Sequence, residues 1–182
     1  MTHKEAVEFL HKGIESKQGI WLDLGAGSGV FSKALAEILP SGSKIYAVDK
    51  NKSVLNISNP ISKNEIIAIQ TDFEELPEFS ELDGILMANA LHYIKTPIPF
   101  LQILLKKLRP KGSFVLIEYD LERGNPWVPF PVSFKKWQTV SRAAGLSIPT
   151  IFSERVSSFG QGTMYAALNY LEHNLDGDAN SF

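Results

Sequence analysis

Apolar residues along the chain alternate between short runs without helical spacing and longer stripes that recur every three or four residues. The short runs predict strands at 19–24, 44–48, 66–69, 82–88 and 113–119. The stripes between them predict amphipathic helices at 30–39 and 97–108. Strands that alternate with helices in this way are typical of an α/β domain with a parallel sheet.

Two further helices are expected outside this alternating middle. Thr2 and Glu5 have the spacing of a capping box and precede an apolar stripe, so a helix is expected at the N-terminus, within residues 1–18. Ser133 is a typical N-cap and Gly145 a typical C-terminal residue, so the apolar stripe between them predicts another helix.

The end of the chain has a different pattern. Two β-rich runs, 148–156 and 163–168, flank the segment 160–162 and predict an antiparallel hairpin. Residues 174–182 are polar, and we expect them to form a flexible tail. Because the chain contains no internal repeat and no linker-like block, residues 1–182 are expected to form a single domain.

Charge and cysteine content narrow the function classes. The net charge of −2 gives the chain no general attraction for nucleic acid, so we do not expect nucleic acid as a partner. No apolar run approaches the roughly 18 residues of a membrane span, and a membrane location is not expected either. The absence of cysteine excludes disulfides, a thiolate nucleophile and a cysteine-ligated metal. We expect a cytoplasmic protein and no metal site.

Three glycines on alternate positions form the most informative motif. Gly25, Gly27 and Gly29 follow the first predicted strand directly and precede the first long helical stripe. Glycine is needed where the backbone takes a positive φ or approaches a ligand closely, and the start of a helix offers unpaired N–H groups. The motif therefore predicts a turn that holds a polar small molecule, with a flexible loop as the alternative. Its spacing differs from the G-x-G-x-x-G of dinucleotide-binding turns.

Acidic residues follow the next two predicted strands. In a parallel βαβ unit, Asp49 at the end of its strand can accept two hydrogen bonds from vicinal ribose hydroxyls; a solvated loop aspartate is the alternative. Asp72 follows the third strand, where it can accept a hydrogen bond from an adenine amino group. The neighbouring Phe73 can cover the adenine ring or pack in the core.

Taken together, Asp23, the three glycines, Asp49 and the pair Asp72–Phe73 resemble the motifs of class I S-adenosylmethionine-dependent methyltransferases. The segment 108–112 also resembles a turn of that family, with Lys111 in place of a glycine. The resemblance implies a doubly wound, mostly parallel seven-stranded sheet with a C-terminal antiparallel hairpin and helices on both faces. It also implies S-adenosylmethionine as the cofactor.

The resemblance assigns parts of the cofactor to individual positions. Asp23 and the glycine turn would hold the methionine portion, Asp49 the ribose, and Asp72 with Phe73 the adenine. The full set of implied cofactor-binding residues is Asp23, Gly25, Ala26, Gly27, Gly29, Asp49, Lys50, Asp72, Phe73 and Asn89.

The acceptor side is less defined. His92 follows the fourth strand and has a side chain that titrates near neutral pH, so it could act as a base toward a hydroxyl or could simply fix the next helix. Tyr93 is a second candidate, more suited to a wall than to catalysis. Trp127 and Phe130 lie in a proline-rich segment, which predicts a substrate-binding lid or a stiff crossover. The segment 89–93 lacks the Asn/Asp-Pro-Pro-aromatic signature of nucleic-acid amino methylases.

We therefore expect a methyltransferase that aligns an activated methyl group with a small-molecule acceptor of unknown identity. One alternative is an NAD(P)-dependent oxidoreductase on a Rossmann fold. The other is a non-catalytic S-adenosylmethionine-binding subunit that serves a partner. The sequence predicts no oligomeric state.

Overall fold

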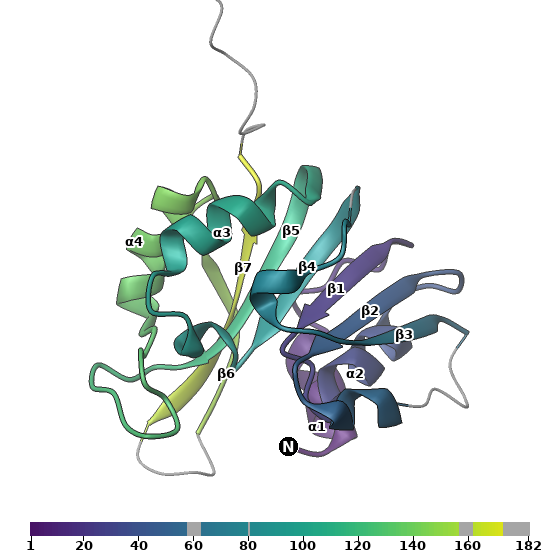
Figure 1. Cartoon of the computed structure of the whole chain (residues 1–182), viewed down its shortest axis with the longest axis horizontal. Coiled ribbons are helices and arrows are strands. Elements are labelled where there is room, and N and C mark those ends of the chain that lie inside the picture. The colour runs from purple at the N-terminus through teal and green to yellow at the C-terminus, as the bar shows by residue number, and fades with distance from the viewer. Residues whose placement is uncertain (58–62, 80, 157–161, 173–182) are drawn as a thin grey trace, which may run out of the picture.

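The computed structural model describes residues 1–57, 63–79, 81–156 and 162–172. Its centre is one seven-stranded sheet in the order β3-β2-β1-β4-β5-β7-β6 (Figure 1). The strands are β1 (Ile20–Leu24), β2 (Lys44–Asp49), β3 (Glu65–Gln70), β4 (Leu82–Ala88), β5 (Leu108–Tyr119), β6 (Thr150–Val156) and β7 (Thr163–Tyr170). The pairs among β1 to β5 are parallel, whereas β7 runs antiparallel to both β5 and β6. The predicted fold class is confirmed.

Helices cover both faces of the sheet, as the fold class requires (Figure 1). The α-helices are α1 (His3–Leu10), α2 (Val30–Ile38), α3 (Pro97–Leu105) and α4 (Phe134–Ala144). Three short 3₁₀ helices lie between strands: η1 (Lys52–Asn56), η2 (Phe73–Glu75) and η3 (Leu91–Tyr93). The first two α-helices pack on one face of the sheet and the last two on the other.

The strand pattern explains the two cores. Side chains alternate between the faces of a strand, so a strand covered on both faces is apolar throughout. In β4, Ile85 and Met87 pack in the core that α3 and α4 cover, whereas Leu86 and Ala88 pack in the core of α1 and α2. A shift of one residue would move each side chain of a central strand into the wrong core, so the register of these strands is fixed. Because the strands are parallel, their carboxyl ends lie at one edge of the sheet.

The helix ends follow the sequence signals with two main differences in length. The helix predicted at 97–108 ends at Leu105, because Leu108 already begins β5. Thr2 and Glu5 form the expected capping box, but α1 ends at Leu10 and occupies only part of the 1–18 range. Ser133 caps α4, and Gly145 ends it in the left-handed conformation with φ of 100°. The predicted hairpin is β6 and β7; its connection at 157–161 and the tail at 174–182 lie outside the described residues. The single-domain organisation of residues 1–182 stays a prediction.

The start of β5 is irregular. The pairing with β4 jumps from Leu82–Leu108 to Gly84–Ser113, so the predicted turn is a bulge within the strand. Lys111 lies in this bulge with φ of 63°, a conformation that suits glycine. Lys111, at the position where the family resemblance implies a glycine, therefore has a backbone conformation typical of glycine.

Candidate active site

The three-glycine turn lies at the carboxyl end of β1 and is fixed to β2. The amides of Gly25 and Ala26 both donate to the carbonyl oxygen of Val48, at 2.8 and 2.9 Å. All three glycines have positive φ, at 84°, 54° and 77° for Gly25, Gly27 and Gly29. A Cβ on Gly25 would lie 2.5 Å from the Cβ of Ala90, whereas a Cβ on Gly27 would have nothing within 4 Å. Gly27 therefore forms the uncovered part of the turn.

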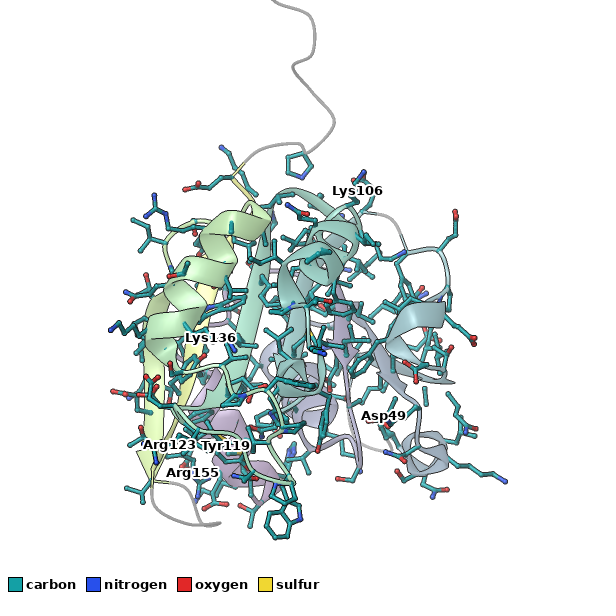
Figure 2. All side chains as sticks on the ribbon, turned by 60° about the vertical axis from the view of Figure 1, so that its left-hand side comes forward. Asp49, Lys106, Tyr119, Arg123, Lys136 and Arg155 are labelled. Carbon is teal, nitrogen blue, oxygen red and sulfur yellow. The ribbon has the colours of Figure 1, made fainter. Side chains whose placement is uncertain are left out.

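Asp49 ends β2 directly beside this turn. Its Oδ2 accepts the amide of Gly27 at 2.8 Å, and its Oδ1 accepts the amide of Asn51 at 2.7 Å. The carboxylate is buried, and two backbone donors fix its orientation. Each carboxylate oxygen can accept more than one hydrogen bond, so Asp49 can also accept from a ligand hydroxyl. Figure 2 labels Asp49 and Tyr119, the last residue of β5, and both lie in the lower part of the view. Lys50 follows Asp49 and is exposed.

Asp23 is fully buried within β1. Its Oδ2 accepts the hydroxyl of Ser32 in α2 at 2.5 Å, but its Oδ1 has no hydrogen-bond partner within the described residues. The pKa of Asp23 is raised to about 7, mainly because the carboxyl group is buried; hydrogen bonds from Ser32 oppose this increase, and the nearby charge of Asp49 contributes to it. Asp23 thus supplies a buried acceptor beneath the glycine turn.

The other predicted cofactor residues come from β3 and β4. Phe73 begins η2, and its Cζ lies 3.5 Å from the place where a Cβ of Gly25 would be. Asp72 precedes it and is exposed. Asn89 follows β4 in the left-handed conformation with φ of 52°, and its buried Oδ1 has no hydrogen-bond partner in the described part of the chain. The next residue, Ala90, lies against Gly25 of the turn. The end of β4, where Asn89 follows, is therefore beside the glycine turn.

The predicted acceptor side of the edge contains a buried histidine. His92 lies in η3, and its Nδ1 is 2.8 Å from Oε2 of Glu118 at the end of β5. The backbone amide of His92 donates to Oε1 of the same carboxyl group at 3.1 Å. Tyr93 is 54% exposed, although its ring centroid lies only 4.4 Å from that of His92. His92 is thus fixed from two sides, while Tyr93 lies at the surface.

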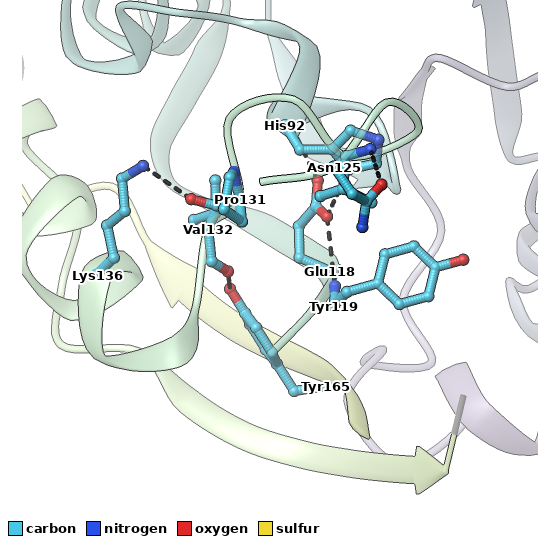
Figure 3. A network of polar contacts seen from close by, with 9 residues as sticks. His92, Glu118, Tyr119, Asn125, Pro131, Val132, Lys136 and Tyr165 are labelled. Carbon is cyan, nitrogen blue, oxygen red and sulfur yellow. Dashed lines mark hydrogen bonds and ion pairs between the residues drawn. The ribbon is translucent and has the colours of Figure 1, made fainter. Parts of the chain in front are cut away.

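The loop at 120–133 between β5 and α4, the predicted acceptor-side loop, is bonded to His92. The amide of Phe130 donates to the carbonyl oxygen of His92 at 3.0 Å, so this loop and η3 are joined. Figure 3 shows two further anchors near the end of the loop, where Tyr165 donates to the carbonyl of Val132 at 2.8 Å and Lys136 to that of Pro131 at 2.8 Å. Trp127, at the loop tip, is 77% exposed. Both predicted acceptor aromatics therefore belong to an anchored loop next to His92.

Sequence reasoning missed Glu118 as a functional candidate. The signal was present, since Glu118 is an acidic residue directly after the apolar run 114–117. A charged residue in such a run is expected to be paired or functional, because an unpaired buried charge is costly. Its partner could not be named, because 26 positions separate it from His92.

Comparison with known proteins identifies the family. A family model described as a methyltransferase domain matches residues 15–167. The chain belongs to the class I S-adenosylmethionine-dependent methyltransferases. This assignment decides against the NAD(P)-dependent oxidoreductase alternative, and it confirms the fold and cofactor that the motifs implied.

Individual methyltransferases match over different shares of their length. The chain is 28% identical over 145 residues to the cypemycin N-terminal methyltransferase of a Streptomyces species, which is 72% of this chain and 58% of that protein. A methyltransferase structure from Aquifex aeolicus has a TM-score of 0.67 at 20% identity and covers 91% of this chain and 89% of its own. The structure of the 1,6-didemethyltoxoflavin-N1-methyltransferase of Burkholderia thailandensis has a TM-score of 0.65 at 18% identity. The match covers 94% of this chain and 78% of that one. The two structures share the fold.

The residues at the glycine edge fit the cofactor of such methyltransferases. S-adenosylmethionine carries an ammonium group, ribose hydroxyls and adenine. Asp23 Oδ1 and Asn89 Oδ1 are buried acceptors without hydrogen-bond partners in the described residues, and an ammonium group donates to such atoms. Asp49 offers a fixed carboxylate for hydroxyls, and Gly27 leaves space for a ligand.

Two other features are absent from the described ranges. None of the helices there has the length and apolar content needed to cross a membrane. Nor do three or more histidine, aspartate or glutamate side chains gather there in a group suited to a metal ion.

Proposed function

We propose that this chain transfers the methyl group of S-adenosylmethionine to a small-molecule acceptor. The observation that carries the proposal is the fixed carboxylate of Asp49, bonded at 2.8 Å to the uncovered Gly27 of the turn. Vicinal hydroxyls of a nucleoside are suitable donors to such a carboxylate, and its charge strengthens both hydrogen bonds.

Methyl transfer requires mainly that the protein align the methyl group with the acceptor. When bound, S-adenosylmethionine supplies an already activated methyl group. The chain needs to hold two reactants in line, an effect worth up to roughly 7–11 kcal/mol where the geometry is good. Asp23, Asp49, Asp72, Phe73 and Asn89 would fix the cofactor. His92, Tyr93, Trp127 and Phe130 would border the acceptor.

Three observations support a small acceptor. The net charge of −2 offers no general attraction for nucleic acid. The loop that contains Trp127 and Phe130 is bonded to His92 through the backbone amide of Phe130, and aromatic residues are common in small-molecule sites. One structural neighbour was solved with 1,6-didemethyltoxoflavin and S-adenosylhomocysteine. The cytoplasmic location stays a prediction of the sequence.

Calorimetry with S-adenosylhomocysteine tests the cofactor half of the proposal. Asp49→Ala should weaken binding by about 10- to 100-fold, because hydrogen bonds to a charged group contribute about 1.5–3 kcal/mol. Glu122→Ala, which removes an exposed acid from the acceptor-side loop, should bind as the wild type does. Equal affinity of wild type and Asp49→Ala would contradict the assignment of Asp49 to the ribose.

A transfer assay tests the enzymatic half. S-adenosylmethionine with a labelled methyl group is incubated with the protein and a panel of phenols, amines, N-heteroaromatic compounds and short peptides. Labelled product from a small molecule supports the proposal. Tight binding of S-adenosylhomocysteine without transfer to any compound would favour the alternative, a cofactor-binding subunit that serves a partner.

A further inference from the structure

Glu118 is a buried carboxylate whose contacts are mainly with His92. The residue is 0% exposed, at the end of β5. Its Oε2 lies 2.8 Å from Nδ1 of His92, and its Oε1 accepts the backbone amide of His92 at 3.1 Å. The amide of Tyr119 adds a longer hydrogen bond to Oε2 at 3.4 Å (Figure 3). Two of its three N–H donors belong to one residue, so Glu118 fixes the orientation of His92.

This arrangement determines which ring nitrogen carries the proton. An ionised carboxylate only accepts hydrogen bonds, so the Nδ1 of His92 that faces Glu118 must be a donor. In the neutral imidazole the other nitrogen, Nε2, is then left with its lone pair. Within the part of the chain that the structure describes, Nε2 forms no hydrogen bond.

The surroundings of the ring are aromatic. The ring centroids of Tyr93 and Tyr119 lie 4.4 and 6.3 Å from that of His92. The acceptor-side loop is bonded to the same residue through Phe130. Flat aromatic walls beside a histidine suit an aromatic ligand.

We propose that Glu118 is a positioning residue that holds His92 with Nε2 as a proton acceptor, and that the methyl acceptor is an aromatic hydroxyl or ring N–H compound. The inference rests on the proposed methyl transfer and names the substrate class for it. The proton of the acceptor passes to Nε2, and the freed electron pair forms the bond to the methyl carbon. The electrons of the broken carbon–sulfur bond stay on sulfur. The imidazolium that results is stabilised by the buried carboxylate of Glu118.

A purely structural role makes a different prediction. If the pair only joins η3 to β5, the tautomer of His92 is irrelevant to transfer. Loss of Glu118 would then lower stability without a selective loss of turnover.

NMR of the wild-type protein tests the tautomer directly. The chain has four histidines, so a protein labelled with ¹⁵N-histidine gives few ring signals, and His92→Gln identifies those of His92. Long-range proton–nitrogen spectra near pH 8 should show His92 with the proton on Nδ1. A proton on Nε2 would overturn the inference. Because this measurement uses the wild type, it does not depend on whether a variant folds.

Kinetics with two matched variants test the consequence. Glu118→Gln keeps the size of the side chain but can donate to Nδ1, which would move the ring proton to Nε2. We expect kcat for an aromatic hydroxyl or N–H acceptor to fall about 10²-fold, with S-adenosylhomocysteine affinity changed less than twofold. Glu8→Gln makes the same chemical change at an exposed position of α1 and should have wild-type kcat. Unchanged kcat in Glu118→Gln would overturn the inference.

The outcomes separate this inference from the proposed function. If wild type fails to bind S-adenosylhomocysteine, the proposed function fails. If it binds the ligand but methylates no phenol or N-heteroaromatic compound, or has the other tautomer, only the inference fails. If Glu118→Gln does not fold, as seen by circular dichroism, Glu118→Asp takes its place. A shorter carboxylate keeps the tautomer and should retain at least a tenth of wild-type kcat, whereas a larger loss would contradict the proposed role.

Discussion

The two halves of the functional edge are built in different ways. On the cofactor side, the glycine turn and Asp49 come from neighbouring strands, and backbone amides join them directly. On the predicted acceptor side, His92 and Glu118 are 26 positions apart, and the acceptor-side loop is bonded to His92 through the amide of Phe130. Each half contains a fully buried carboxyl group. That of Asp23 has one oxygen without a partner in the described residues, whereas both oxygens of Glu118 accept hydrogen bonds.

The two halves thus differ in whether the protein itself satisfies the hydrogen bonds of the buried carboxyl group. A buried oxygen without a partner is costly in the free protein and becomes favourable when a ligand donates to it. Under the proposed function, the cofactor half would therefore be completed by its ligand. The acceptor half satisfies its buried carboxylate within the protein, so its residues are oriented before any acceptor arrives.

The largest expected effect is on the glycine turn. In Gly25→Ala, the new Cβ would lie 2.5 Å from that of Ala90, and φ of 84° is unfavourable for alanine. We expect a loss of about 3 kcal/mol in the free energy of unfolding, together with loss of S-adenosylhomocysteine binding. Urea unfolding and calorimetry measure the two effects. A stable variant with normal binding would show that the turn is not rigid.

Gly27→Ala is the matched control for that variant. Its Cβ would meet nothing within 4 Å, so only the φ of 54° costs stability, about 1 kcal/mol. Binding should still fall at least tenfold, because the methyl group fills the space proposed for the ligand.

The second prediction concerns the unpaired buried carboxyl of Asp23. Its pKa is raised from 3.8 to about 7, so the folded state keeps a proton that the unfolded state loses between about pH 4 and 7. As the pH rises through this window, Asp23 destabilises the wild type by an amount on the order of a few kcal/mol. Urea unfolding from pH 4 to 8 should show that Asp23→Asn lacks this decline. Parallel pH profiles for the two proteins would contradict the raised pKa.

A smaller effect is expected away from both halves. Lys111 has φ of 63° in the bulge of β5, so Lys111→Gly should raise the free energy of unfolding by about 1 kcal/mol. Cofactor affinity and turnover should not change, because the bulge lies at the opposite end of the strand from Glu118. Lower stability in urea unfolding would show that the lysine side chain makes a favourable contact that outweighs the strain.

The smallest stability effect is expected at the tip of the acceptor-side loop. Trp127 is 77% exposed, so Trp127→Ala should change the free energy of unfolding by less than about 0.5 kcal/mol. If Trp127 borders the acceptor, KM for the acceptor rises several-fold while S-adenosylhomocysteine affinity is unchanged. Steady-state kinetics measure this separation between the halves, and an unchanged KM would remove Trp127 from the site.

The same division explains what could be predicted from the sequence. The strand and helix pattern and the positive φ of Gly25, Gly27 and Gly29 follow from local residue types. The pair His92–Glu118 depends on the parallel neighbours β4 and β5, whose register no local pattern encodes. The burial of Asp23 could not be predicted from the sequence either, because an acid inside a strand can face either solvent or a core. The shorter α1 reflects a weak signal at its C-terminal end.

The most direct measurement is a crystal structure of the protein with S-adenosylhomocysteine. The account predicts the nucleoside across Gly27, with both ribose hydroxyls within hydrogen-bond distance of Asp49 and the amino group near Asp23 and Asn89. Ligand bound elsewhere, or a ribose out of reach of Asp49 at full occupancy, would contradict it.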